Sequence, residues 1–392
     1  MNSYMISSEK NQNKMTILDY IRTHEDTTRT RIAKETHVSK ATVTRVVEKL
    51  KNEGVLVEAS QGQSSGGRKP VFIEINGAAG YCISINITIK MLTASIIDLR
   101  MRVIARETYS VDGISANAVL MLIKDSIDSL LRKKEVDPLK IMGIGIGVPG
   151  AVDYETGVVK KFGAWSDLFD VSLREFVEEQ FHYPVYIDNI VNANAQSEYW
   201  YGYGIGYQNL LFILCSEGVG CSIIENGTVF HGRNNLSFEF GHTSVSMDNR
   251  LCRCGRRGCV EAYCSLTSIE KIAAENIPQT SSLSRDNVTF KRVCDGASDG
   301  DEYCRKVLYD AANHLSTAIA NIAEIFNPQA IIFSGKVISE SDFFYDKTKE
   351  LLNNKFFEYT QKNIHYFRRS HKDALYELGA GVLVLNNYFK NV

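Results

Sequence analysis

Three cysteines fall within eight residues near the middle of the chain, in the run Cys252-Arg-Cys-Gly-Arg-Arg-Gly-Cys259. His242 precedes this run, and its two glycines allow the chain to turn sharply. Three thiolates and one imidazole are a ligand set that binds Zn²⁺ tetrahedrally, whereas unconnected free thiols need not gather in one loop. Since four protein ligands leave no open position for water, we expect a structural zinc bound by His242, Cys252, Cys254 and Cys259.

The cysteines and the N-terminal segment together indicate the cellular compartment. The chain has 392 residues and nine Cys, and its polar segment from Met1 to Lys14 lacks the apolar core of a signal peptide. It contains no run of about 18 apolar residues, which a membrane-spanning helix requires. We therefore expect a cytoplasmic protein with no membrane partner and no disulfide framework. The cysteines outside the cluster are expected to be core thiols: Cys82, Cys215, Cys221, Cys264, Cys294 and Cys304.

Charge divides the chain into two unequal parts. Hydrophobic residues make up 44% and charged residues 23% of the sequence, which excludes intrinsic disorder and a fibrous fold. Residues 1–76 hold seven Lys and five Arg against two Asp and seven Glu, a net charge of +3. Because the whole chain carries −2, residues 77–392 carry −5. We expect a small basic domain over 1–76 and a large, mildly acidic domain over 77–392.

The basic segment has the pattern of a helix-turn-helix. Apolar residues recur at helical spacing around 15–21, and a second helix is expected over 28–36. Ser39 is a suitable N-cap for a third helix that ends near Gly54. The stripe of this helix that we expect to be buried is Val43, Val46, Val47 and Leu50. Its exposed start carries hydroxyl and basic side chains that suit major-groove edges and phosphates, namely Ser39, Lys40, Thr42, Thr44 and Arg45.

Two short strands, over 55–58 and 71–75, follow the third helix. The polar residues 59–69 between them form the expected wing, whose Arg68 and Lys69 can reach a minor groove or phosphates. The alternative is a three-helix module that contacts another protein. Helix pattern and basic wing together favour operator DNA as the partner. Because such modules commonly bind two-fold operators as dimers, we also expect a homodimer or higher homo-oligomer.

From Gly80 onward, strands alternate with helices, which is typical of an α/β fold. Residues 81–87 and 92–99 predict a hairpin. Further strands are expected over 141–148, 185–188, 210–215 and 330–333, and helices over 116–132 and 305–326.

These features resemble the ROK family, which includes transcriptional repressors and sugar kinases. The resemblance rests on the winged helix of its repressor branch and on Val148–Asp153, Glu239–His242, Cys252–Glu261 and Leu378–Ala380. It implies an actin-like ATPase fold of two lobes, with a boundary near 193 and a sugar cleft between the lobes. It also implies a C-terminal helix over about 374–390 that returns to the first lobe. The sugar ligands that it implies are Asn189, Glu239, His242 and Glu261.

Three positions that kinases of this family use for phosphoryl transfer differ in this chain. The first phosphate loop, Asp-x-Gly-Gly-Thr in the kinases, corresponds to Asn86–Lys90, which lacks the carboxylate and both glycines. The second, Gly-Thr-Gly-Ile-Gly, corresponds to Ser216–Gly220, where Glu217 would repel a phosphate. The Asp that accepts the sugar proton corresponds to Ile190, which cannot take a proton. We therefore expect neither kinase activity nor ATP as a cofactor.

The expected function is a DNA-binding transcriptional regulator, a repressor of carbohydrate-use genes such as those of xylose metabolism. Its kinase-like domain would sense a sugar or sugar derivative. One alternative is an ATP-dependent sugar kinase that carries a DNA-binding domain, and another is regulation by a protein such as a sugar-transport component. For Glu239 and Glu261, the structural alternative is that they only support the zinc loop.

Overall fold

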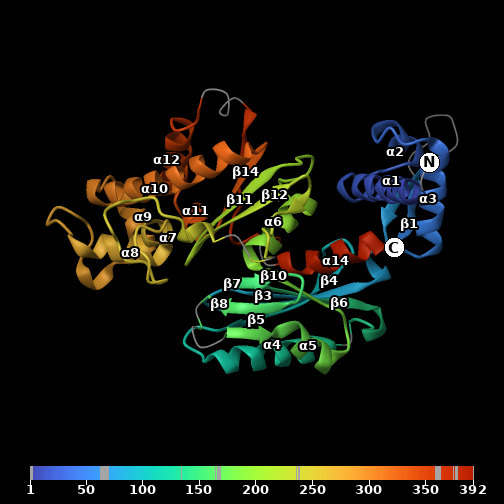
Figure 1. Cartoon of the computed structure of the whole chain (residues 1–392), viewed down its shortest axis with the longest axis horizontal. Helices are drawn as coiled ribbons and strands as arrows, with labels where there is room; N and C mark the ends of the chain where they lie inside the picture. Colours follow the sequence, from blue (N-terminus) through green and yellow to red (C-terminus); the bar gives the residue numbers. More distant parts are fainter. Residues whose placement is uncertain are drawn as a thin grey trace. The chain divides into compact units, whose positions relative to one another are not determined.

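The computed structural model describes residues 3–61, 70–133, 135–163, 165, 169–234, 236, 239–357, 363–373, 375 and 378–391. The chain forms two compact units, which are described separately (Figure 1). The first unit comprises Met1–Val148, Thr156–Asp188 and Leu378–Val392. The second comprises Pro149–Glu155 and Asn189–Glu377. Among the described residues, no helix is both long and apolar enough to span a membrane.

The first unit begins with three helices and a hairpin: α1 (Ser3–Thr23), α2 (Arg29–Glu35), α3 (Lys40–Asn52), β1 (Leu56–Gln61) and β2 (Val71–Ile75). The expected second and third helices are confirmed, and Thr28 and Ser39 cap their N-termini. The first helix begins well before its apolar stripe, at Ser3. Val43, Val47 and Leu50 are buried as expected, whereas Val46 is only partly buried.

A five-stranded sheet follows, in the order β10-β6-β3-β4-β5. Its strands are β3 (Tyr81–Ile87), β4 (Met91–Asp98), β5 (Val103–Ser110), β6 (Ile141–Val148) and β10 (Val185–Asn189). The β3–β4 pair is the predicted antiparallel hairpin, and β6 lies parallel to β3. Helices α4 (Ala116–Leu131) and α5 (Leu173–Phe181) lie on one side of the sheet, and α14 (Gly379–Asn391) lies on the other (Figure 1). A separate hairpin consists of β8 (Val158–Phe162) and β9 (Phe169–Ser172).

Helix α14 approaches the sheet very closely at its N-terminus. A methyl group added at Gly145 of β6 would overlap the backbone carbonyl of Ala380. On the neighbouring strand, Asn86 Oδ1 accepts a hydrogen bond from Ala380 N at 3.3 Å, and Ser84 Oγ accepts one from Gly381 N at 3.0 Å. The first turn of a helix leaves such amides without intrahelical partners, so these two side chains satisfy them. Strand β3 therefore fixes the start of α14.

The second unit is built on a sheet in the order β13-β12-β11-β14-β15. Its strands are β11 (Leu210–Cys215), β12 (Val219–Glu225), β13 (Thr228–Val229), β14 (Ala330–Ser334) and β15 (His365–Arg368), and β7 (Gly150–Asp153) lies apart from this sheet. Its helices are α6 (Ile190–Tyr201), α7 (Glu261–Cys264), α8 (Leu266–Glu275), α9 (Phe290–Ser298), α10 (Glu302–Phe326), α11 (Lys336–Glu340) and α12 (Asp342–Asn353).

Alternate residues of β11 enter different parts of the core. Leu211 and Ile213 belong to a large cluster that includes the apolar side of α10. Leu210 and Phe212 pack with Ala195 of α6 in a second cluster. Because successive side chains of a strand point to opposite faces, the sheet is covered on both sides. The six cysteines outside the His242 cluster are free and buried, as expected.

Gly145→Ala tests the close approach of α14. We expect it to destabilise the protein by about 1–3 kcal/mol, because the added methyl forces the helix away from β6. Urea unfolding followed by circular dichroism would measure this loss. The control is Asn117→Ala, an exposed substitution in α4 that should change stability by less than about 0.5 kcal/mol. Equal midpoints for the two variants would contradict the close packing.

Candidate DNA-binding surface and metal centre

The turn between α2 and α3 is tight, and His37 within it has a left-handed backbone with φ of 57°. At the start of α3, Ser39 Oγ accepts a hydrogen bond from Thr42 N at 3.2 Å and donates one to Thr42 Oγ1 at 3.0 Å. Thr44 Oγ1 donates to the carbonyl of Lys40 at 2.9 Å. The three hydroxyl residues that the sequence singles out therefore also stabilise the first turns of α3.

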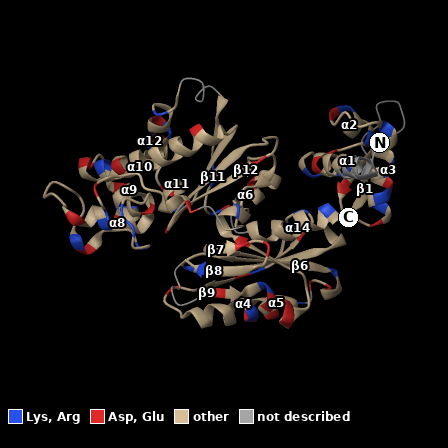
Figure 2. Cartoon of the chain, in the orientation of Figure 1, with Lys and Arg blue, Asp and Glu red and all other residues tan. Residues whose placement is uncertain are grey.

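The basic side chains of this module fall into two groups. The side chains of Lys40 and Arg45 are exposed and make no hydrogen bond or ion pair with any described residue. Arg29 and Lys51 instead join α2 and α3 to β1. Arg29 Nη2 lies 3.2 Å and Lys51 Nζ 2.6 Å from Glu58 Oε1. Their hydrogen bonds, from Lys51 above all, lower the pKa of the Glu58 carboxyl. Figure 2 shows both signs of charge on these helices.

The wing is described only at its base. Strands β1 and β2 pair antiparallel, from Leu56 opposite Ile75 to Gln61 opposite Val71. Arg68 and Lys69, the basic residues expected at its tip, lie outside the described residues.

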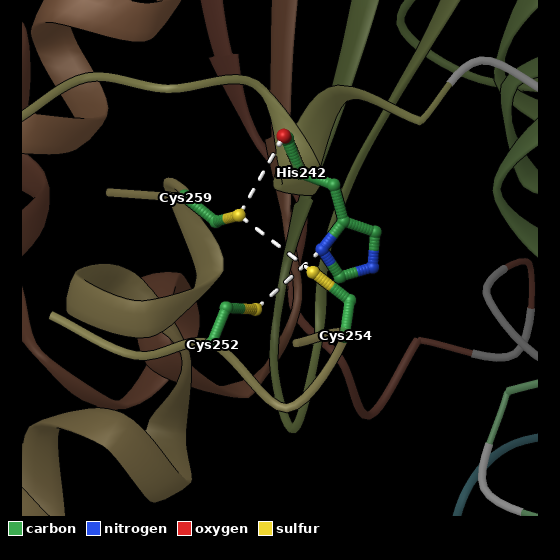
Figure 3. A group of neighbouring side chains, drawn as sticks. All are labelled: His242, Cys252, Cys254 and Cys259. Atoms are coloured by element: carbon green, nitrogen blue, oxygen red, sulfur yellow. Dashed lines mark hydrogen bonds between the residues drawn. The ribbon is translucent and has the colours of Figure 1, made fainter. Parts of the chain in front are cut away.

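The predicted metal ligands come together in the second unit. Their ligand atoms all lie within 4.8 Å of one another: one nitrogen of His242 and the sulfurs of Cys252, Cys254 and Cys259 (Figure 3). Cys254 Sγ lies 3.8 Å from Cys259 Sγ, and Cys252 Sγ lies 3.6 Å from His242 Nδ1. Tetrahedral Zn²⁺, with Zn–S bonds of about 2.3 Å and a Zn–N bond of about 2.0–2.1 Å, places its ligands about 3.6–3.8 Å apart. Donor set and spacing therefore both fit a zinc ion.

The loop that carries the thiols is held by its own backbone. Cys252 N donates to the Arg256 carbonyl at 2.8 Å, and Gly255 N donates to the Cys252 carbonyl at 3.0 Å. Gly258 has φ of 77°, and a methyl group there would overlap the carbonyl of Ser246. Burial, reinforced by its thiol neighbours, raises the pKa of Cys259 to about 12. Because only thiolates bind zinc, loading this site must release protons.

The residues expected to bind a sugar differ in exposure and in hydrogen bonding. Glu239 has half of its side chain exposed, and its Oε2 lies 3.9 Å from Nε2 of His242, the ring nitrogen that faces away from the thiols. Asn189 uses both ends of its amide: Nδ2 donates to the Gly150 carbonyl at 2.7 Å, and Oδ1 caps α6 by accepting from Val191 N at 2.7 Å.

Glu261 is the most enclosed of these residues. Its Oε1 accepts from Arg253 Nε at 2.6 Å, and its Oε2 accepts from Arg253 Nη2 at 3.1 Å and from Val219 N at 3.2 Å. Arg253 is not among the site residues predicted from the sequence. Its position between two metal-ligating cysteines is the one feature of the sequence that marks it. Periodicity and motif spacing do not predict which partner such an arginine has.

The turn between β11 and β12 connects these groups. The backbone N–H of Val219 donates to the Glu261 carboxylate. Gly241 approaches the backbone carbonyl of Val219 so closely that a side chain at position 241 would overlap that carbonyl. A methyl group at Gly220 would lie 2.7 Å from Val191, the second residue of α6. The start of β12 thus contacts the carboxylate of Glu261, the backbone next to His242 and the helix that Asn189 caps.

The residues at the three positions used by the kinases are either buried or hydrogen-bonded to other residues of the chain. Asn86 is buried, donating to Ser84 Oγ at 3.1 Å while it accepts from the start of α14. Glu217 Oε2 accepts from Ser216 Oγ at 2.7 Å. Ile190, at the first position of α6, is buried.

Comparison with known proteins assigns both parts of the chain. A model of an HTH domain matches residues 13–67, and the model of the ROK family matches residues 82–387. The xylose repressor of Caldicellulosiruptor bescii is 30% identical over 387 residues, which are 96% of each chain. The N-acetylglucosamine repressor of Escherichia coli O6:H1 is 26% identical over 91% of this chain and 88% of its own.

Solved structures confirm the expected fold. A ROK family transcriptional regulator, a homologue of the E. coli MLC protein, superimposes with a TM-score of 0.81 and 21% identity over 97% of both chains. A ROK family glucokinase from Streptomyces griseus, in complex with glucose and AMPPNP, has a TM-score of 0.68 and 24% identity and covers 78% of this chain and 99% of its own. The fold is therefore helix-turn-helix followed by the actin-like sugar kinase fold. With matches to a family model over most of its length, the chain belongs to the ROK family.

Proposed function

We propose that the chain is a sequence-specific repressor of carbohydrate-use genes that binds operator DNA as a homodimer in the cytoplasm. One observation carries this proposal: a helix-turn-helix with two unpaired basic side chains on α3 is joined to a kinase-like domain in which Asn86, at the first phosphate-loop position, caps α14. Relatives named as repressors match across both parts, which supports the same function.

Lys40 and Arg45 are the residues that we propose to contact base edges or phosphates, because both are exposed and without a partner among the described residues. Ser39, Thr42 and Thr44 would add contacts from the first turns of α3. On the wing, Arg68 and Lys69 are proposed to bind phosphates or a minor groove.

We propose that His242, Cys252, Cys254 and Cys259 hold one structural Zn²⁺. The supporting observation is the tetrahedral spacing of one nitrogen and three sulfurs. With its coordination filled by protein, such an ion supplies no catalytic water. Its role is to fix the imidazole of His242 so that Nε2 faces Glu239.

The proposed effector is a sugar bound near Asn189, Glu239, His242 and Glu261. D-xylose and N-acetylglucosamine are the first candidates, because they occur in the names of relatives. The sugar can release DNA only if it binds more tightly to the dimer geometry that does not fit the operator. The alternative is a protein effector. Specific DNA binding that no sugar weakens would favour it.

We further propose that the kinase-like domain does not transfer phosphate. A kinase needs a base beside the sugar and an open, neutral phosphate loop. Here the base position holds the buried Ile190, Asn86 caps α14, and Glu217 adds negative charge at the second loop.

Arg45→Ala tests the DNA-binding surface. We expect DNA binding to weaken by about 1–3 kcal/mol, the range for loss of one good base contact. Fluorescence anisotropy with DNA from upstream of the gene itself would measure this change. Arg132→Ala, which removes an exposed arginine after α4, is the matched control and should bind like wild type. Unchanged binding by Arg45→Ala would argue against α3 as the recognition helix.

Cys254→Ser tests the metal centre. We expect wild-type protein to contain about one zinc per chain and the variant to lose most of it, because three ligands remain. Metal analysis after gel filtration gives the answer. Cys294→Ser, at a free thiol outside the cluster, should keep its zinc. A well-folded wild type without metal would defeat the assignment.

Phosphoryl transfer is tested by a coupled ADP-release assay with D-xylose, D-glucose and N-acetylglucosamine. We expect no turnover by wild type. Ile190→Asp alone should not restore it, because Asn86 and Glu217 remain. Steady ADP formation that Glu239→Ala abolishes would establish the sugar kinase instead.

A further inference from the structure

The pair of Arg253 and Glu261 has a marked asymmetry of exposure. The Glu261 side chain is 6% exposed, and its two oxygens accept three hydrogen bonds. The Arg253 side chain is 47% exposed and uses Nε and Nη2 for the carboxylate. No described residue bonds to its Nη1. The guanidinium of Arg253, and not the carboxylate of Glu261, is therefore the group that solvent reaches.

Arg253 covers the Glu261 carboxylate, whose oxygens already accept three hydrogen bonds and whose side chain is only 6% exposed. Bidentate pairs between arginine and carboxylate are among the stronger hydrogen-bonded contacts in proteins. Breaking such a pair at a buried carboxylate leaves a charge without its partner, which costs more than a single hydroxyl bond returns. We therefore expect the pair to stay closed when a ligand binds, so that the ligand meets the guanidinium.

Arg253 lies close to the other proposed sugar contacts. A methyl group at Gly218 would lie 3.4 Å from Arg253 Nη2 and 3.1 Å from Glu261 Oε2, which places the pair over the β11–β12 turn. The next residue, Val219 at the start of β12, adjoins Gly241, the neighbour of His242. The guanidinium and the imidazole are thus connected through one short turn.

Charges around the guanidinium favour a neutral ligand. Glu261 already neutralises Arg253, and Glu217 precedes Gly218 in the same turn. Glu239, beside His242, adds another carboxylate. Because Glu261 already balances the charge of Arg253, an anionic group would gain less here than at an unpaired guanidinium.

We infer that Arg253 takes over from Glu261 as the residue that contacts the ligand, donating its free N–H groups to hydroxyl, ring or carbonyl oxygens of an uncharged sugar. This inference rests on the proposed sugar-sensing function. Glu261 acts as a positioning residue, because it fixes the plane of the guanidinium.

The test is isothermal titration of the full chain with D-xylose, D-glucose, N-acetylglucosamine and N-acetylglucosamine 6-phosphate. For each neutral sugar that wild type binds, Arg253→Gln should weaken binding about tenfold or more, as expected for loss of hydrogen bonds from a charged donor. Arg253→Lys should also weaken it, because an ammonium cannot reproduce the planar fork. The phosphorylated sugar should bind wild type more weakly than its neutral form.

Arg257→Gln is the matched control. Arg257 is an exposed arginine of the same loop, it donates to the Asn249 carbonyl at 2.8 Å, and it makes no hydrogen bond or ion pair with Glu261. This variant should bind sugar like wild type. Zinc content and circular dichroism verify that each variant is folded. If Arg253→Gln does not fold, sugar binding by Arg253→Lys tests the inference.

Equal or tighter sugar binding by both Arg253 variants would overturn the inference while leaving sugar sensing intact, since the ligand would then reach Glu261. Tighter binding of the 6-phosphate would overturn the preference for an uncharged ligand. If wild type binds none of the four compounds, the inference and the sugar-sensing proposal both fail, whereas DNA binding is judged separately through Arg45→Ala.

Discussion

The gathering of one imidazole and three thiols is the constraint on which the second unit's candidate site depends. His242 ends a short 3-10 helix, Phe240–His242, whereas the three cysteines lie in a separate loop. Spacing that suits a tetrahedral ion explains why His242 has one ring nitrogen directed at the thiols and the other at Glu239. The same loop carries Arg253 to Glu261. A single cation would therefore organise every charged group of the proposed sugar site.

The positions that would serve phosphoryl transfer illustrate how an enzyme fold can be kept for another purpose. Asn86 joins Ser84 in capping α14, and this helix packs against β6 so closely that only glycine fits at position 145. Asn189 likewise caps α6 and bonds to Gly150. These polar groups stabilise the fold through their hydrogen bonds. A repressor needs such a framework to be stable and ligand-responsive, but it needs no catalytic base.

Sequence patterns predicted a large part of this structure because local rules determine it. The cap at Ser39, the β3–β4 hairpin and the cluster of His242 with three cysteines all follow from residue types at fixed spacing. The start of α1 at Ser3 was not predictable from an apolar stripe, since the stretch 7–14 is polar and interrupts it. The Arg253–Glu261 pair was missed for a different reason. It depends on side-chain directions set by the folded loop, which spacing alone does not specify.

The measurement that tests the central claim most directly is a titration of the DNA upstream of the gene with the intact protein. It should be made with and without the candidate sugars in the presence of ATP, with ADP followed in the same samples. We predict saturable DNA binding that at least one sugar weakens, and no ADP above background. Sugar-dependent ADP formation without specific DNA binding would contradict the proposal and identify the chain as a kinase.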